Sequence, residues 1–352
     1  MTGKQRFLTA LNGGRPDRVP IFLRDLTLGL DLCDLDTSQV SGGYDSVAAV
    51  QAVVASQRRF HQDAVVGCIH DLGLDVEAFG GHVEFPRRGI PFVARAPFAD
   101  ADRLREVRSV DPAENGRWPA VIETYRLVKQ QLGDDVAIAA NIEGPVTRAG
   151  VLRGLDKLAM DLMRRPALAA ELVELSTTIA EAHVRSLAGA GADLVFVAAA
   201  SDGPAAISPT HYAELTIPGL RRIVAAARDC ELPVVFHPHG PFTDPRFREL
   251  VDMALDCGIQ GFQFGEGCDL SLARELWGDR ACILGGPDVP EVLLPGPVEK
   301  VRRVTADCLD RAMGTGGFVL MASCSLHRNT PSAHIDAMVE TALARGQYTQ
   351  GA

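Results

Sequence analysis

Short apolar runs alternate with longer stretches of helical spacing along most of the 352-residue chain. The runs are rich in Val, Ile, Leu, Phe and Ala, whereas stretches such as 156–190 and 208–228 are rich in Ala, Leu, Glu and Arg. Buried parallel strands are continuous apolar runs, and their alternation with helices is typical of parallel β-α-β units. The candidate strands are Val19–Arg24, Ala64–Asp71, Val136–Ile142, Asp193–Ala199, Pro233–His239, Ile259–Gly265, Ala281–Asp288 and Gly317–Cys324. Eight such strands predict an α/β protein folded as a (β/α)8 barrel of the TIM type.

One stretch departs from this alternation. Between residues 79 and 98, two short apolar segments flank the turn-forming sequence Pro86-Arg87-Arg88-Gly89. We interpret this stretch as a small β-hairpin inserted between barrel elements. Since no internal repeat, low-complexity tract or linker interrupts the sequence, we expect residues 1–352 to form a single domain.

Composition narrows the function classes. Hydrophobic residues make up 47% of the chain, which is enough for a large core, and the formal net charge of -10 argues against a nucleic-acid-binding protein. No segment approaches the roughly 18 consecutive apolar residues of a membrane span, and the first residues lack the apolar core of a signal peptide. The eight cysteines have no paired spacing, which favours reduced thiols in the cytoplasm over a disulfide framework.

Polar side chains follow the apolar runs at the point where each predicted strand ends. In a (β/α)8 barrel these ends meet at one rim, where the active site lies. Acidic residues after strands also cap the following helix, which is the alternative for Asp25, Asp202 and Asp288, and Arg24 could be a structural ion-pair partner. In strand order the rim residues are Arg24 with Asp25, His70 with Asp71, Asn141 with Glu143, Ser201 with Asp202, His237 with His239, then Glu266, Asp288 and Cys324.

The sequence His237-Pro238-His239 stands out among these ends. Residues i and i+2 of a strand point to the same side, and Pro238 cannot donate a ladder hydrogen bond, so the strand is expected to end there. Two His and one Cys, with Cys324 converging from the eighth strand, suffice to bind Zn²⁺ with one position left open. Alternatives are a metal-free catalytic or recognition role, or a purely structural one, and a lone Cys is often a small buried hydrophobe.

The chain resembles the uroporphyrinogen decarboxylase superfamily, and within it the cobalamin-linked methyltransferases that pass methyl groups between corrinoid proteins and acceptors such as coenzyme M. The resemblance extends over nearly the whole length and implies a (β/α)8 barrel. The residues that carry it are Arg6-Phe7-Leu8-Thr9-Ala10-Leu11, Arg15-Pro16-Asp17-Arg18-Val19-Pro20, Asn141-Ile142-Glu143-Gly144-Pro145, Ile207-Ser208-Pro209-Thr210-His211-Tyr212, Gly285-Gly286-Pro287-Asp288, Cys324-Ser325-Leu326 and Asn329-Thr330-Pro331.

The two branches of this superfamily differ in two regions of the sequence, the N-terminal loop and the zinc motif. The decarboxylases carry an Arg-rich N-terminal loop, whereas this chain keeps Arg24 and adds Asp25, which would repel a polycarboxylate. The methyltransferases use a His-X-Cys zinc motif with a distant Cys. Here His237 and Cys324 match that motif, but His239 replaces its middle Cys. A His₂Cys set is one unit more positive than His-Cys₂, so a different metal also becomes an option.

The resemblance implies a zinc-dependent methyltransferase that moves a methyl group between methylcobalamin on a separate corrinoid carrier protein and a small acceptor, such as a thiol. It also implies a homodimer. The metal ligands would be His237, His239 and Cys324. The candidate catalytic residues are Glu266, Asp288 and Asp71, and the candidate substrate-binding residues are Arg24, His70, Asn141 and Asp202.

Two other interpretations stay open. One is a metal-independent decarboxylase of a tetrapyrrole or another small acid, which would use Asp71 and Arg24; the decarboxylases carry a pyrrole-binding Asp that matches Asp71. The other is a corrinoid or tetrapyrrole binder without catalytic activity. The methyl acceptor is equally open between a thiol, tetrahydrofolate and a specialised metabolite, and a folate acceptor would weaken the argument for zinc.

Overall fold

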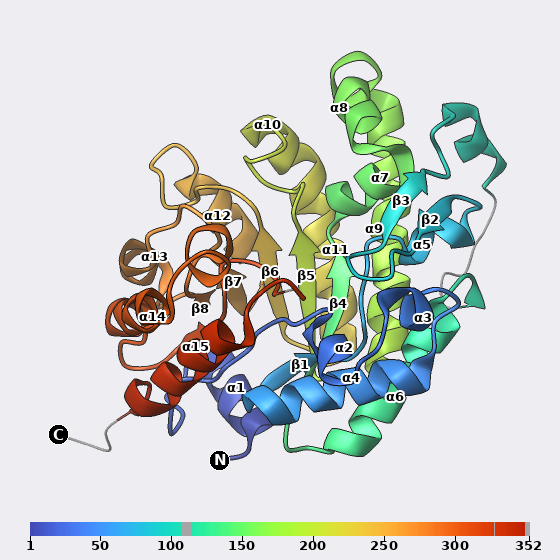
Figure 1. Ribbon diagram of the computed structural model, residues 1–352. Helices are drawn as coiled ribbons and strands as arrows, with labels where there is room; N and C mark the ends of the chain where they lie inside the picture. The colour runs from blue at the N-terminus through green and yellow to red at the C-terminus, as the bar shows by residue number, and fades with distance from the viewer. Residues whose placement is uncertain (108–113, 327, 349–352) are drawn as a thin grey trace.

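Seven parallel strands form one curled sheet in the computed structural model, which describes residues 1–107, 114–326 and 328–348 (Figure 1). The order in the sheet is the order along the chain, as expected when each strand is followed by helical chain that returns to the amino end of the next. All residues in these strands are buried, which explains their continuous apolar sequence. The strands are β1 (Ala64–Val66), β4 (Ala137–Glu143), β5 (Leu194–Ala199), β6 (Val234–Pro238), β7 (Gly261–Gln263), β8 (Cys282–Gly285) and β9 (Phe318–Leu320).

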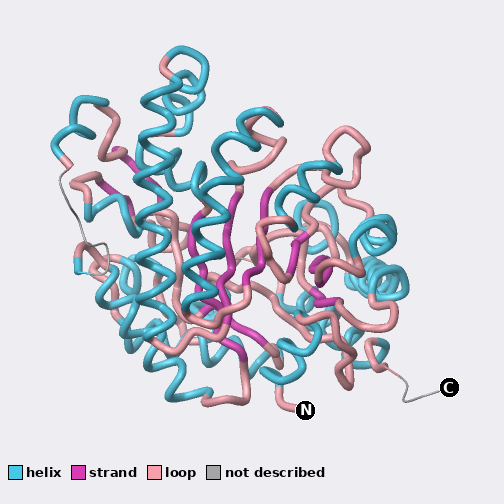
Figure 2. Tube along the Cα trace, turned by 180° about the vertical axis from the view of Figure 1, so that it is seen from behind, coloured by secondary structure: helices cyan, strands magenta, loops and turns pink. Residues whose placement is uncertain are grey.

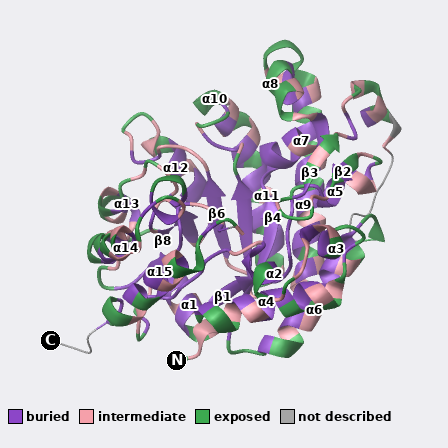
Figure 3. Cartoon of the chain, viewed as in Figure 1, coloured by how far each residue is buried: buried purple, intermediate pink, exposed green. Residues whose placement is uncertain are grey.

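Helices surround this sheet and bury its outer face (Figures 2 and 3). The first helix begins with a capping box, in which the Thr2 side chain accepts from the Gln5 amide and the Gln5 side chain accepts from the Thr2 amide. The α-helices are α1 (Gly3–Leu11), α2 (Leu28–Leu32), α3 (Thr37–Ser41), α4 (Ser46–Phe60), α5 (Leu74–Ala78), α6 (Trp118–Leu132), α7 (Pro145–Arg153), α8 (Leu155–Arg164), α9 (Pro166–Gly189), α10 (Pro209–His211), α11 (Ile217–Asp229), α12 (Arg248–Leu255), α13 (Leu270–Trp277), α14 (Val298–Ala312) and α15 (Ser332–Arg345). A 3₁₀ helix covers Ala101–Glu106, and π-helical turns cover Tyr212–Thr216 and Val289–Leu293.

The first predicted strand, residues 19–24, is not a strand of the sheet, so seven of the eight predicted strands are present. The segment lies beside β9, where Leu320 N donates to Pro20 O and Phe22 N donates to Leu320 O, each at 3.0 Å. Toward β1, this segment has one backbone hydrogen bond among the described residues, from Asp63 N to Ile21 O. Side chains accept from the amides of Ile21 and Leu23 instead. Asp63 Oδ2 accepts from Ile21 N at 2.8 Å, and Gln62 Oε1 accepts from Leu23 N at 3.3 Å. These two side-chain hydrogen bonds replace the backbone hydrogen bonds that would join a strand at 19–24 to β1.

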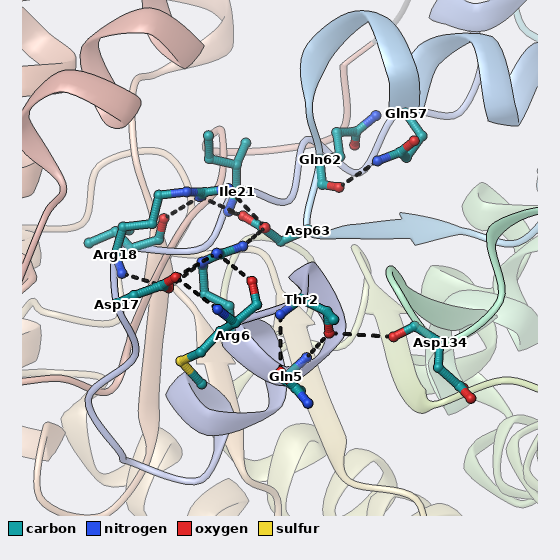
Figure 4. Close-up of polar contacts among 12 residues, drawn as sticks. Thr2, Gln5, Arg6, Asp17, Arg18, Ile21, Gln57, Gln62, Asp63 and Asp134 are labelled. Carbon is teal, nitrogen blue, oxygen red and sulfur yellow. Dashed lines mark hydrogen bonds and ion pairs between the residues drawn. The ribbon is translucent and has the colours of Figure 1, made fainter.

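Asp63 also joins two cations at this end of the sheet (Figure 4). Its two carboxylate oxygens accept hydrogen bonds of 2.6 Å from Arg6 Nη1 and 2.7 Å from Arg18 Nη1. Arg6 in turn pairs with Asp17. The N-terminal helix and the 15–25 segment are therefore attached to β1 through one buried carboxylate.

The segment 79–98 contains an antiparallel pair, β2 (His82–Glu84) and β3 (Phe92–Arg95), with an irregularity between His82 and Val83. The pair lies outside the main sheet on the same side as α8 and α10, beyond the carboxyl ends of the strands (Figure 1). Of the helices in the described residues, none combines the length and the apolar composition that a bilayer crossing requires.

Candidate metal centre and its surroundings

His237, His239 and Cys324 meet at the carboxyl ends of the strands. His237 lies in β6, paired in register with Ala198 of β5, and His239 follows the end of that strand. Cys324 lies four positions beyond the end of β9. The two Nε2 atoms are 3.2 Å apart, and Cys324 Sγ lies 3.8 Å from Nε2 of His237 and 3.7 Å from Nε2 of His239.

A glycine fixes the position of His239. The carbonyl of His239 accepts a hydrogen bond from the Ala205 amide at 3.3 Å, so the chain after β6 lies against the loop after β5. A Cβ atom at Gly203 would lie 2.3 Å from the His239 carbonyl oxygen, closer than any real side chain could approach. The absence of a side chain at Gly203 therefore allows the backbone of His239 to pack closely against the loop after β5.

Electrostatics favour the ligand forms of Cys324 and His237, but not that of His239. Burial would raise the pKa of the Cys324 thiol, but hydrogen bonds with both imidazoles and the positive charge of Arg24 outweigh it and lower this pKa to about 3. Burial lowers the pKa of His237, which keeps that imidazole neutral, whereas the contact with Cys324 raises the pKa of His239. A thiolate and a neutral imidazole are the species that bind transition metals.

The spacing of the three ligand atoms fits a tetrahedral ion. With metal–nitrogen distances near 2.05 Å and a metal–sulfur distance near 2.3 Å, tetrahedral Zn²⁺ requires about 3.3 Å between nitrogens and about 3.6 Å between nitrogen and sulfur. The separations of 3.2, 3.7 and 3.8 Å lie within about 0.2 Å of these values. All three ligand atoms lie within 4.8 Å of one another, and no fourth His, Cys, Asp or Glu joins the cluster in the described part of the chain. The set is therefore suited to zinc with an open position.

A cavity of about 170 Å³ adjoins the three ligands. Its walls are mostly apolar, with a few polar groups, as is usual for a small-molecule site. The predicted rim residues Arg24, His70 and Asp71 all line it, together with Leu26, Leu72, Ile90, Thr147, Ala198, Ala199, Ala200 and Ser325.

Arg24 and Asn141 form one side of this site. The Arg24 guanidinium is buried, and its Nε donates to Asn141 Oδ1 at 3.1 Å. Burial lowers the pKa of Arg24, and the thiolate of Cys324 partly offsets this effect. The guanidinium also lies 4.8 Å from the Phe196 ring centroid. Asn141 Nδ2 is buried without a hydrogen-bond partner among the described residues, so this amide retains an unused donor.

His70 belongs to a buried chain of charges that extends away from the cavity. Its Nε2 lies 2.7 Å from Glu143 Oε1, and Glu143 Oε2 accepts from Arg148 Nη2 at 2.7 Å. Arg148 Nε donates to Asp75 Oδ2 at 2.7 Å, and Asp75 Oδ1 accepts from Trp118 Nε1 at 2.6 Å. Burial lowers the pKa of His70, but the Glu143 carboxylate raises it to about 10. This histidine is thus held as a cation beside the cavity.

The Asp71 carboxylate, which follows β1, already accepts hydrogen bonds from neighbouring protein groups. Arg117 binds it with two hydrogen bonds, of 2.7 Å to Oδ2 and 3.1 Å to Oδ1, and the Gly73 amide donates to Oδ1 at 2.7 Å. Arg117 also bonds Glu77 at 2.7 Å. The Asp71 carboxylate touches the cavity, yet its oxygens are already occupied by protein donors.

Glu266 and Asp288 have different contacts, and only those of Asp288 are typical of a helix cap. Glu266 Oε1 accepts from the Ser323 hydroxyl at 2.9 Å, and its negative charge helps to raise the pKa of His239. Asp288 accepts from the Glu291 amide at the start of the turn Val289–Leu293. Neither residue lines the cavity.

Asp202 is fully buried under α7. It accepts from the Val146 and Thr147 amides, each at 2.9 Å, and from the Thr147 hydroxyl at 2.6 Å. These are the contacts of a helix cap, but the capped helix is α7, which precedes β5, and not the following helix that the sequence predicts as the alternative. Asp202 does not line the cavity.

Sequence reasoning missed the partners that hold the rim residues. Arg117 and Arg148 lie at or near helix starts, far along the chain from the acids Asp71 and Asp75 that they bind. The one available signal was that Arg148 follows Glu143 closely within a mostly apolar stretch. Gln263, at the end of β7, was also missed.

Comparison with known proteins shows the family of the chain and similarity over its whole length. The family model described as Uroporphyrinogen decarboxylase (URO-D) matches residues 2–344. The methylcobamide:CoM methyltransferase MtaA of Methanosarcina barkeri is 28% identical over 99% of this chain and 98% of its own length. A uroporphyrinogen decarboxylase of Syntrophotalea carbinolica is 25% identical over 71% of this chain and 70% of its own. Among solved structures, a methyltransferase from Methanosarcina mazei has a TM-score of 0.85 and 24% identity, and covers 98% of this chain and 99% of that one.

Proposed function

This chain belongs to the uroporphyrinogen decarboxylase family, and we propose that within it the protein is a corrinoid-linked methyltransferase with Zn²⁺ held by His237, His239 and Cys324. The observation that carries this proposal is the meeting of two imidazoles and one thiol, from distant parts of the chain, at the separations a tetrahedral ion requires. The full-length similarity to a methylcobamide:CoM methyltransferase supports the reaction type.

The reaction exchanges one bond for another. The acceptor sulfur forms a bond to the methyl carbon, the cobalt–carbon bond breaks with its electron pair remaining on cobalt, and the thiol proton leaves. A bound Zn²⁺ would lower the pKa of the acceptor thiol so that it reacts as a thiolate near neutral pH. Glu266, which accepts a hydrogen bond from Ser323, next to Cys324 in the sequence, is our candidate to accept the released proton.

The volume of the cavity restricts the size of the methyl acceptor and of the methyl donor that can enter it. About 170 Å³ accommodates a small thiol but not a corrin macrocycle, so the corrinoid would approach from outside on a separate carrier protein. Arg24 and the cationic His70 line this cavity and would bind the polar end of the acceptor, with Asn141 supporting Arg24. All eight cysteines are free thiols, which agrees with the reducing cytoplasm that we propose as its location. We also retain a homodimer as part of the proposal.

The metal-independent decarboxylase has less support. It would use Asp71, whose carboxylate oxygens are engaged by Arg117 and the Gly73 amide. It would also leave the convergence of the two histidines and Cys324 without a role.

The proposal is tested in two steps. Protein purified without an affinity tag is first analysed for bound metal, and we expect close to one zinc per chain. Methylcobalamin is then mixed with this protein and a panel of small thiols, with tetrahydrofolate as a separate acceptor, and loss of the methylcobalamin spectrum is followed. A folded protein that binds no zinc, cobalt or iron would refute the metal centre, and carbon dioxide release from a tetrapyrrole acid in the presence of a chelator would favour the decarboxylase.

A further inference from the structure

Cys324 lies in a loop, so its position depends on what holds the chain just before it. The last residue of β9 is Leu320, and Met321, Ala322 and Ser323 connect that strand to Cys324. A metal site needs its ligands within about half an ångström of their final positions, and loop residues reach this precision only when neighbouring groups fix them. The contacts of Ala322 and Ser323 therefore decide where the sulfur lies.

One side chain holds both carbonyls of this dipeptide. Gln263, at the end of β7, is fully buried, and its Nε2 donates to Ala322 O at 3.0 Å and to Ser323 O at 2.9 Å. An amide NH₂ is suited to this task because it offers two donors from one atom. Gln263 Oε1 is buried without a hydrogen-bond partner among the described residues, so the side chain is placed for its donors rather than for its acceptor.

The other groups of Ser323 are held from β7 and β8. Its amide donates to Pro287 O at 3.0 Å, and its hydroxyl accepts from the Val289 amide at 2.9 Å while donating to Glu266. Gly265 permits this packing, because a Cβ atom there would lie 3.1 Å from Ser323 O. The segment before Cys324 is thus clamped between the ends of two strands.

We propose that Gln263 is a positioning residue for the metal centre: by binding the carbonyls of Ala322 and Ser323 it holds the Cys324 sulfur within reach of both imidazoles. This inference rests on the proposed metal-binding function. Groups that fix a ligand without touching the metal typically change metal affinity by about 10- to 100-fold when removed.

The chain offers a matched control directly before the same strand. Gln260 lies three positions earlier and also bonds the backbone, accepting from Val234 N at 2.7 Å and donating to Gly258 O at 2.9 Å. It does so at the opposite end of β7, away from the metal centre. Gln263→Met and Gln260→Met therefore each remove one glutamine amide that supports backbone, but only the first removes the clamp.

Two measurements test the clamp. Zinc affinity is measured by competition with a chromogenic chelator, and we expect Gln263→Met to weaken it by about 10-fold or more. Gln263→Glu should also weaken it, because a carboxyl group can donate at most one hydrogen bond and so cannot bind both carbonyl oxygens. Gln260→Met should stay within about twofold of the wild type, although each change lowers the unfolding midpoint.

Hydrogen exchange gives a readout without metal. In the metal-free protein, a peptide covering 321–326 should exchange faster in Gln263→Met than in the wild type or in Gln260→Met. Unchanged exchange in Gln263→Met would overturn the clamp, as would unchanged zinc affinity. A wild type that binds no metal but shows this exchange difference would refute the proposed metal centre while leaving the clamp on Cys324 intact.

Discussion

The Nε2 atom of His70 lies 2.7 Å from Oε1 of Glu143, and both side chains are almost completely buried. Burial alone would make both groups neutral. The pair instead stays ionised because Arg148 binds the second oxygen of Glu143 and is itself bound by Asp75. The cavity beside His237, His239 and Cys324 is therefore bordered by a histidine whose raised pKa favours the positively charged form at neutral pH.

This pair predicts a loss of stability in alkali. The pKa of His70 is raised to about 10 in the folded protein, above its unfolded value of about 6.5. The stabilisation is thus fully present below about pH 6.5 and is lost as the pH rises through 10. Urea unfolding of the wild type and of His70→Gln, measured from pH 6 to pH 10, should give a difference in unfolding free energy that shrinks with pH. A difference that stays constant would contradict a charged His70.

Cys324→Ser should abolish tight zinc binding, since a neutral hydroxyl replaces the thiolate and two imidazoles remain. We expect zinc affinity to fall by at least about 100-fold, measured with a competing chelator. Cys33→Ser removes a partly exposed thiol far along the chain and should leave the affinity unchanged. Equal losses in both variants would mean that general unfolding, rather than loss of a ligand, causes the effect.

His239→Cys should convert the site to two thiolates and one imidazole, the set of the methyltransferases that this chain resembles. We expect the variant to retain zinc and to lower the net charge of the centre by one unit. Cobalt-substituted protein provides the measurement, because each thiolate adds to the near-ultraviolet charge-transfer absorption. An absorption no stronger than that of the wild type would place the side chain at 239 outside the metal's reach.

Asp71→Ala should destabilise the fold, which could be mistaken for a catalytic effect. The change leaves the Arg117 charge buried with one partner fewer, and breaking a buried pair in this way costs about 3–5 kcal/mol. Glu77→Gln changes the other, more exposed partner of Arg117 and should cost less than about 1 kcal/mol. Urea unfolding at pH 7 distinguishes the two. Full stability of Asp71→Ala would restore Asp71 as a catalytic candidate.

The parts of the fold that the sequence could predict are those set by local burial. β5 and β6 are apolar on both faces, so the expected strands 193–199 and 233–239 agree with the observed ones to within about a residue. Residues 19–24 have the same composition, but Pro20 lacks an amide hydrogen and the side chains of Gln62 and Asp63 replace the ladder toward β1. Composition does not distinguish a backbone partner from a side-chain partner.

The same limit applies to the site. The convergence of His237, His239 and Cys324 could be predicted because the ends of parallel strands gather at one edge. The contacts of Asp71 and Asp202 could not, because Arg117 and the start of α7 reach them only through the tertiary structure. A strand-end acid has the same sequence signature whether it faces a substrate or closes a helix.

Elsewhere around the sheet, neighbouring strands are joined by rows of peptide hydrogen bonds, which no single substitution can remove. Between residues 19–24 and β1 the join rests largely on Asp63, which binds Arg6, Arg18 and the Ile21 amide at once. A substitution at Asp63 is therefore expected to remove most of the hydrogen bonds between residues 19–24 and β1, while the bonds of this segment to β9 remain. It would loosen on one side the segment that carries Arg24, whose side chain borders the cavity.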